Sequence, residues 1–358
     1  MKQKKDSIEF LFKYMNAISP TGFEKNGQEI WSAYVANYVD EVASDVYGTA
    51  YGIINPGCDF SVLIEAHADE ISWFVNYITD DGFIYVIRNG GSDHLIAPSM
   101  RVNIHTEQGL VRGVFGWPAI HTRRGKQEDL TPKLENIFVD VGAKNKQEVL
   151  DMGIHVGCVI TFVDDFDMLN NQYYYGRALD NRIGGYCIAE VARRLSEKKI
   201  RLPFTLYVVN SVQEEIGLRG AEMIAHTLRP NVAIITDVTH DTHTPMLNKI
   251  QQGDISCGGG PVLYYAPPVH NKLLKLLRNT AKKSKIDVQL GASSRVTGTD
   301  TDAFAYANGG IPSALISLPL RYMHTTVEMV HKSDIENTIQ LMTDFLKTFS
   351  SDFNFKYY

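Results

Sequence analysis

Residues 62–70 read Val62-Leu63-Ile64-Glu65-Ala66-His67-Ala68-Asp69-Glu70, an apolar run that ends in side chains able to bind metals and move protons. The short apolar run with β-branched residues predicts a buried strand. Alternate residues of a strand point the same way, so we expect His67 and Asp69 to face one side together. A metal-binding histidine commonly donates its other ring N–H to a carboxylate, and Asp69 stands where such a partner is needed. Taken alone, the stretch also fits a polar strand end in an ordinary loop.

The composition places few limits on the function. The chain has 358 residues, of which 44% are hydrophobic and 21% charged, as in a soluble globular protein with one large core or two domains. Its formal net charge of -6 gives no reason to expect nucleic acid or an anionic membrane as a partner.

The sequence also suggests a compartment. The basic residues 1–6 are not followed by an apolar segment, and no run approaches the ~18–20 apolar residues that cross a bilayer. No two of the four cysteines form a CxxC pair, so we expect buried free thiols in a reducing compartment: Cys58, Cys158, Cys187 and Cys257. These features predict a cytoplasmic protein.

Two kinds of pattern divide the chain. Residues 71–165 hold short strand-like segments with hairpin signals such as Asp80-Asp81-Gly82, which predict a small β-rich domain. From about residue 175, strands and helices alternate, which is typical of a three-layer α/β domain. We therefore expect residues 1–70 and 166–358 to form one α/β domain and residues 71–165 to be inserted into it. The polar segment His121–Asp129 is too long for a hairpin turn, and such loops are usually functional or disordered.

Carboxylates follow or open several of the predicted elements, where open α/β sheets keep their ligand sites. Asp180 lies at the start of a predicted helix over 182–195, where an N-cap is the ordinary alternative. Glu214 and Glu215 follow the strand predicted over 204–209. Neighbours in an extended segment point to opposite sides, so one can bind a metal while the other faces a reacting water. A solvated loop is the alternative for this pair.

Two more ligand-type residues come after later strands. Asp237 follows the apolar strand predicted over 232–235, and a carboxylate there costs free energy unless it is paired or metal-bound. His324 follows the strand predicted over 313–316, and a satisfied core histidine is its alternative. Taken together, two histidines and three carboxylates suit a pair of divalent ions with one carboxylate bridging them.

At this point the sequence resembles the tetrahedral aminopeptidases, a family of co-catalytic metallopeptidases that includes bacterial glutamyl aminopeptidase. The resemblance covers nearly the whole chain, and the motifs occur in the family's order: His67-Ala68-Asp69-Glu70, Arg177-Ala178-Leu179-Asp180-Asn181-Arg182, Glu214-Glu215-Ile216-Gly217-Leu218-Arg219-Gly220-Ala221, Thr236-Asp237 and Arg321-Tyr322-Met323-His324. Their joint occurrence is specific, whereas His-x-Asp alone is weak.

The resemblance implies a role for each matching residue. It implies that His67, Asp180 and Asp237 hold one divalent ion, while Asp180, Glu215 and His324 hold the other. Asp180 would bridge the two ions, and such a ligand set suits zinc, cobalt or manganese. In the same way it implies that Glu214 is the general base and that Asp69 supports His67.

The resemblance also implies an activity and an assembly. The expected reaction removes N-terminal residues from short peptides with a metal-activated water. The expected inserted domain, of a barrel or PDZ-like type, mediates dimerisation, and dimers assemble into hollow tetrahedral dodecamers. The segment His121–Asp129 is then a candidate for reaching a partner's active site, or an ordinary surface loop.

Three other functions remain open from the residues alone. A related di-metal amidase or deacylase acting on N-acyl amino acids would use the same ligands. A glycoside hydrolase could use Asp69 and Glu214 as its acid pair, but this leaves the other ligand-type residues without a role. A non-enzymatic scaffold would have lost ligands, and none is lost. The sequence does not identify the preferred N-terminal residue, although Arg219 and Arg295 are candidate partners for an acidic side chain.

Overall fold

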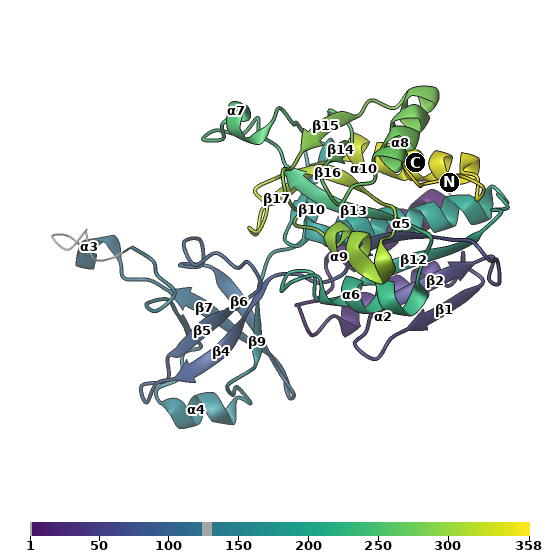
Figure 1. The fold of residues 1–358 in the computed structure, drawn as a ribbon. Helices are drawn as coiled ribbons and strands as arrows, with labels where there is room; N and C mark the ends of the chain where they lie inside the picture. The colour runs from purple at the N-terminus through teal and green to yellow at the C-terminus, as the bar shows by residue number, and fades with distance from the viewer. Residues whose placement is uncertain (1, 124–130) are drawn as a thin grey trace. The chain divides into compact units, whose positions relative to one another are not determined.

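The computed structural model describes residues 2–123 and 131–358, and their contacts divide the chain into two compact units (Figure 1). The unit that we call the sheet unit comprises Met1–Glu70, Phe166–Met323 and Val327–Tyr358, and the barrel unit comprises Ile71–Asp165 and His324–Thr326. Most of the segment His121–Asp129 lies outside the described residues. The expectation that residues 71–165 form an independent domain stays a prediction.

An eleven-stranded mixed sheet forms the centre of the sheet unit, with the strand order β1-β2-β12-β3-β13-β16-β17-β11-β10 and with β14 and β15 attached beside β16. Its four central strands are parallel: β12 (Thr205–Ser211), β3 (Ser61–His67), β13 (Val232–His240) and β16 (Ser313–Arg321). They are buried on both faces, which explains why they read as continuous apolar runs rather than as alternating patterns.

Shorter strands extend this centre on both sides, mostly through antiparallel pairing. They are β1 (Glu41–Ser44), β2 (Ala50–Ile54), β10 (Asp167–Leu169), β11 (Tyr173–Gly176), β14 (Val262–Tyr265), β15 (Gln289–Ala292) and β17 (Glu328–His331).

Helices cover both faces of the sheet. On one face, α5 (Leu179–Glu197) packs against the central strands and is surrounded by α1 (Lys2–Met15), α2 (Lys25–Val35) and α10 (Lys332–Thr348). On the other face lie α6 (Arg219–Leu228) and α9 (Thr301–Tyr306). Neighbouring residues of β3 show the two sides, because Ala66 packs against Gly184 of α5 while Glu65 points towards Asp300, just before α9. The remaining helices are α7 (Lys249–Gln252), α8 (Asn271–Ser284) and the 3-10 turn η2 (Ala307–Gly309).

The barrel unit is a closed six-stranded barrel in the order β4-β5-β8-β7-β6-β9. Its core is separate from that of the sheet unit and includes Trp73, Phe115 and Ile160, all 1% exposed or less. Its elements are β4 (Ser72–Ile78), β5 (Ile84–Asn89), β6 (Arg101–Thr106), β7 (Gly109–Gly116), α3 (Ile120–Arg123), β8 (Phe138–Asp140), α4 (Lys146–Asp151) and β9 (Val159–Phe162). The predicted fold class, an α/β sheet domain with a small β-rich barrel, is confirmed.

Several details differ from the sequence-based expectation. The strand that carries Asp237 does not end before it, because β13 continues to His240 through its ladder with β16. All four cysteines are free, but only Cys158 and Cys187 are buried. Among the helices of residues 2–123 and 131–358, none is both long enough and apolar enough to span a membrane.

Candidate metal centre

Five of the predicted site residues come together at the carboxyl ends of the parallel strands. His67 is the last residue of β3, Asp237 lies in the neighbouring β13, and Glu214 and Glu215 follow β12 on the other side of β3. Asp180 lies in the first turn of α5, which packs beside these strands. Parallel strands end at one edge of the sheet, so residues far apart in the chain meet there.

The imidazole of His67 is the centre of this group. Its Nε2 atom lies 3.1 Å from Asp180 Oδ1, 3.8 Å from Glu214 Oε2 and 3.9 Å from Asp237 Oδ1. The ring is buried, with 1% of the residue exposed. One nitrogen therefore faces three carboxylates from three different segments of the chain.

Two sets of ligand-type atoms lie close enough together to hold a metal ion. The first set is His67, Asp180 and Glu215, and the second is His67, Glu214 and Asp237. Within each set, one ligand atom from each residue lies within 4.8 Å of those of the other two. These sets differ from the ligand sets implied by the family resemblance, which place Asp180 and Asp237 with His67. All five residues nevertheless belong to a single cluster, because both sets contain His67.

Asp69 makes contacts beyond its expected partner. Its Oδ1 atom lies 3.2 Å from His67 Nδ1, which is ion-pair range, although the geometry does not satisfy a hydrogen bond. The backbone N–H groups of Glu214 and Glu215 donate to its two oxygens at 3.0 and 3.2 Å, and the Thr21 hydroxyl donates at 2.8 Å. Asp69 thus fixes the loop that carries both glutamates as well as facing the histidine, and it is fully buried.

The turn at Asp180 is held from two sides. The side chain of Asn181 donates to the Thr236 carbonyl at 2.7 Å, which joins the turn to β13 beside Asp237. The backbone N–H of Asp180 donates to Glu328 Oε2 at 3.1 Å. The peptide bond between Asp180 and Asn181 is cis. The Thr236 carbonyl on one side and the Glu328 carboxylate on the other therefore set the position of Asp180.

Left-handed backbone conformations occur beside the site residues. Ala178 has a φ of 57°, Gln213 a φ of 58° and His324 itself a φ of 62°. Such values are uncommon outside glycine and cost free energy, and they concentrate at functional sites. They lie in the three segments that carry Asp180, the two glutamates and His324.

Burial and mutual repulsion control the protonation of the carboxylates. Burial raises the pKa of Glu214 to about 10, opposed by His67 and reinforced by Asp237, Asp300 and Glu215. Burial likewise raises the pKa of Asp237 well above its ordinary value. The pKa of His67 is raised well above the usual value; burial lowers it, but Glu214, Asp180 and Asp69 outweigh that effect. A cation placed among these groups would relieve the repulsion.

A second pair of carboxyl groups, which the sequence analysis missed, lies behind the cluster. The Ser211 hydroxyl is 2.5 Å from Glu65 Oε1 and 2.7 Å from Asp300 Oδ2, and both acids are 1% exposed or less. A hydroxyl has one proton to donate, so one of the two carboxyls must itself be protonated. Burial raises the pKa of both acids accordingly. Glu65 precedes His67 by two residues on a strand, and this spacing could have placed it on the same side.

His324 belongs to the barrel unit. Within that unit its ring packs on the backbone of Gly91, where an added Cβ would lie 2.5 Å from His324 Nδ1. Its expected role as a ligand stays a prediction. The two arginines considered for substrate binding give no support for that role, since Arg219 pairs with Glu222 on an exposed surface and Arg295 is itself exposed.

The donor set fits divalent metal ions. Two carboxylates join the His67 imidazole in each of the two sets, and borderline ions such as zinc, cobalt and manganese accept both nitrogen and oxygen ligands. Without a cation, so many buried acids could remain only by taking up protons. The cluster is therefore chemically suited to a metal centre.

Comparisons with known proteins agree with this chemistry. The family model of the M42 glutamyl aminopeptidases matches residues 51–341. A lysyl aminopeptidase of Pyrococcus furiosus is 34% identical over 338 residues, which cover 93% of this chain and 94% of that protein.

Solved structures give the same result. The TET aminopeptidase of a marine sediment Thaumarchaeota archaeon is 29% identical, with a TM-score of 0.91 over 97% of both chains. The TET1 peptidase of Pyrococcus horikoshii, described as assembling into a tetrahedron or a large octahedral shell, is 26% identical. Its TM-score is 0.83, over 95% of this chain and 99% of that one.

Proposed function

The chain belongs to the M42 glutamyl aminopeptidase family and is a metal-dependent aminopeptidase, and from this premise we propose which residues carry out its reaction. The family implies divalent metal ions. We assign one ion to His67, Asp180 and Asp237 and a second ion to Asp180, Glu215 and His324, with Asp180 bridging the two. Zinc, cobalt and manganese all suit these ligands.

One observation carries the proposal. His67 Nε2 lies within 3.1–3.9 Å of three carboxylates, the buried Asp180 and Asp237 and the partly buried Glu214, with Glu215 in the same cluster. A purely structural histidine needs one or two polar partners. A centre in which several acids face one imidazole is instead explained by the cation that they would share.

Glu214 is the proposed general base. Divalent ions held by this set would supply a water of lowered pKa and polarisation of a peptide carbonyl. Glu214 takes the proton of the attacking water and delivers it to the leaving amine. Asp69 holds the backbone of Glu214 and faces the ring of His67, so it keeps the base and a ligand in a fixed relationship.

The proposed substrates are short peptides with a free N-terminus. The proposed assembly is a homo-oligomer larger than a dimer in which residues 71–165 of the barrel unit provide a dimer contact. Support comes from the likeness to the TET1 peptidase, which assembles into large shells. The four free cysteines support a cytoplasmic location.

The experiment that tests the activity is a panel of substrates with free and blocked N-termini. The protein is stripped with a chelator and assayed before and after addition of zinc, cobalt or manganese. We expect cleavage of free-amine substrates only, with activity lost on chelation and restored by metal. Cleavage of N-acylated substrates in preference to free amines would favour the amidase alternative.

A further inference from the structure

A buried group of three charges lies directly beside the proposed metal ligands, and neither the reaction nor the ligand sets use it. It consists of Glu70, Arg177 and Arg182, which are 2%, 9% and 0% exposed. Arg177 donates to Glu70 Oε2, and Arg182 NH2 lies 3.3 Å from Glu70 Oε1. Burial alone raises the pKa of Glu70, but the two guanidinium groups lower it below its ordinary value, so Glu70 is ionised.

The positions of these residues in the chain matter more than their charges. Glu70 immediately follows Asp69 and stands three residues after His67, at the end of β3. Arg177 and Arg182 stand three residues before and two residues after Asp180. The ion pairs therefore join the two segments that carry the most closely spaced ligand pair, His67 and Asp180.

The loop before α2 (Lys25–Val35) completes the group. The backbone N–H of Ser19 donates to Glu70 Oε1 at 2.9 Å. The carbonyl of Ala17 accepts from both arginines, at 3.2 Å from Arg177 NH2. The two arginines thus have fixed partners on the same loop, and rotation of either side chain would break a buried hydrogen bond.

We propose that Glu70 is a positioning residue, which with Arg177 and Arg182 holds His67 and Asp180 at ligand spacing before any metal binds. This inference rests on the proposed metal ligands. Without such a clamp, the mutual repulsion of the buried acids would favour separation of the strand end from the α5 turn. The clamp adds one net positive charge beside these acids, since two guanidinium groups share one carboxylate.

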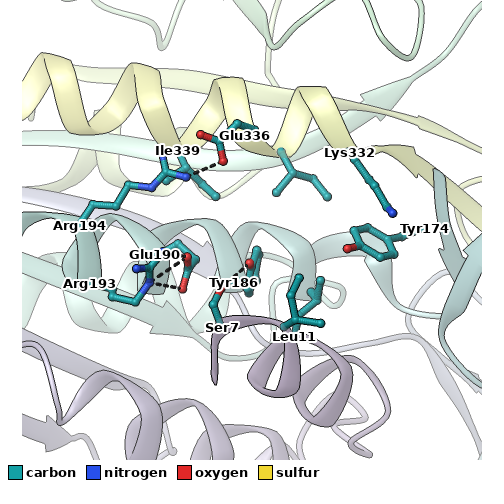
Figure 2. A pocket seen from close by; sticks show the side chains of 12 residues that line it. Ser7, Leu11, Tyr174, Tyr186, Glu190, Arg193, Arg194, Lys332, Glu336 and Ile339 are labelled. Carbon is teal, nitrogen blue, oxygen red and sulfur yellow. Dashed lines mark hydrogen bonds and ion pairs between the residues drawn. The ribbon is translucent and has the colours of Figure 1, made fainter. Parts of the chain in front are cut away.

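A matched control residue lies on α5, the helix that carries Arg182. Glu190 is also a 2%-exposed glutamate of a buried ion pair, and it accepts bonds from Arg193 at 2.6–3.0 Å and from Tyr34 at 2.5 Å. Figure 2 shows this pair lining a pocket between α1, α5 and α10. Glu190 is eight residues after Arg182, or roughly 12 Å along the helical part of α5. Glu190→Gln therefore removes the same chemistry from α5 without touching the metal cluster.

The experiment measures metal affinity and ligand geometry rather than turnover alone. Wild type, Glu70→Gln and Glu190→Gln are stripped of metal and titrated with Co²⁺ against a chromophoric chelator, and the visible absorption of bound Co²⁺ is recorded. We expect Glu70→Gln to bind Co²⁺ about 10- to 100-fold more weakly, with an altered visible spectrum. Glu190→Gln should match wild type in both, although thermal unfolding of the metal-free proteins should show both variants destabilised.

The outcomes separate the two proposals. If wild type binds no Co²⁺, the metal assignment fails, and the clamp fails with it. If wild type binds Co²⁺ and Glu70→Gln binds it equally well with the same spectrum, only the clamp is refuted. Equal weakening in Glu190→Gln also refutes it, because the effect is then one of general stability. If Glu70→Gln does not fold, Arg177→Lys takes its place and is judged by the same criteria. This change keeps the positive charge but loses the forked geometry of the guanidinium group.

Discussion

His67 Nε2 lies 3.1 Å from Asp180 Oδ1, although 113 residues separate them in the chain. The contact joins the end of a central strand to the start of the helix that covers it. Around it gather the other carboxylates of the cluster, Glu214 and Glu215 from the loop after β12 and Asp237 from β13. Because both residues are proposed metal ligands, we expect a change at either one to weaken metal binding.

Asp180→Ala should reduce bound metal more than any other single ligand change. We propose Asp180 as the bridge, so the change removes a ligand from both ions. The measurement is metal content by elemental analysis after dialysis, together with activity, which should be lost. Asp334→Asn is the control, since Asp334 is also a buried aspartate, whose oxygens accept hydrogen bonds from the backbone of Gly258 and Gly260. Asp334→Asn should keep its metal. Full metal occupancy in Asp180→Ala would rule out Asp180 as the bridging ligand.

Glu214→Gln and Glu215→Gln should have different effects although the residues are neighbours. Glu214→Gln should keep the metal and lose roughly 10²–10⁴-fold in kcat, the usual contribution of a general base. Glu215→Gln should weaken metal binding. Parallel measurement of kcat and metal content separates the two, and the reverse pattern would show that the roles are exchanged.

Gly91→Ala tests His324 without replacing any ligand. The backbone of Gly91 is close enough to the His324 ring that an added Cβ would lie 2.5 Å from Nδ1 and 2.7 Å from Cε1, so the ring must move. We expect lower occupancy of the second metal site and reduced activity, as in His324→Ala. Gly109→Ala is a control in the same unit, because nothing lies within 4 Å of its added Cβ, although its φ of 126° adds backbone strain. Normal metal content in both His324→Ala and Gly91→Ala would remove His324 from the ligand set.

Glu24 should make stability depend on pH. Burial, reinforced by Asp69, raises the pKa of Glu24 from 4.5 to about 7 in the folded protein. Between these values the folded state binds more protons than the unfolded state, so the free energy of unfolding falls as pH rises. Glu24→Gln should therefore match wild type near pH 4.5 and exceed it above pH 7 by up to roughly 3 kcal/mol.

Urea unfolding of both proteins at several pH values, with the metal concentration held constant, measures this difference. Glu29→Gln is the control, because Glu29 is exposed and pairs only with Lys25 on the surface. A Glu24→Gln advantage that does not change with pH would contradict the raised pKa.

Light scattering at micromolar concentration with metal present tests the proposed assembly. We expect a homo-oligomer larger than a dimer, active on short peptides and inactive on folded proteins. Deletion of residues 71–165 with a short linker should give smaller species. A monomeric intact protein would refute the assembly and leave the active-site assignment standing.

Local patterns in the sequence predicted the main strands and helices and supplied the residues that we propose for the site. The apolar run before His67 predicted β3 because a strand buried on both faces needs no polar alternation. The alternation of strands and helices after residue 175 predicted the α/β sheet, because each strand or helix is recognised from the pattern of its own residues. The motifs that carry His67, Asp180 and Glu214 are short and local, so they could be recognised without knowledge of which strands are neighbours.

Only the tertiary structure decided which residues meet. Strand order places β3 between β12 and β13, and this order brings Asp69 to the backbone of Glu214 and Glu65 to Asp300. The clamp between Glu70 and its two arginines likewise depends on how α5 packs on the sheet. Such contacts join residues far apart in the chain, and their free energy comes from burial and charge pairing that exist only once the core has formed. A periodicity of two or 3.6 residues records which face of an element is buried, but not which other element covers it.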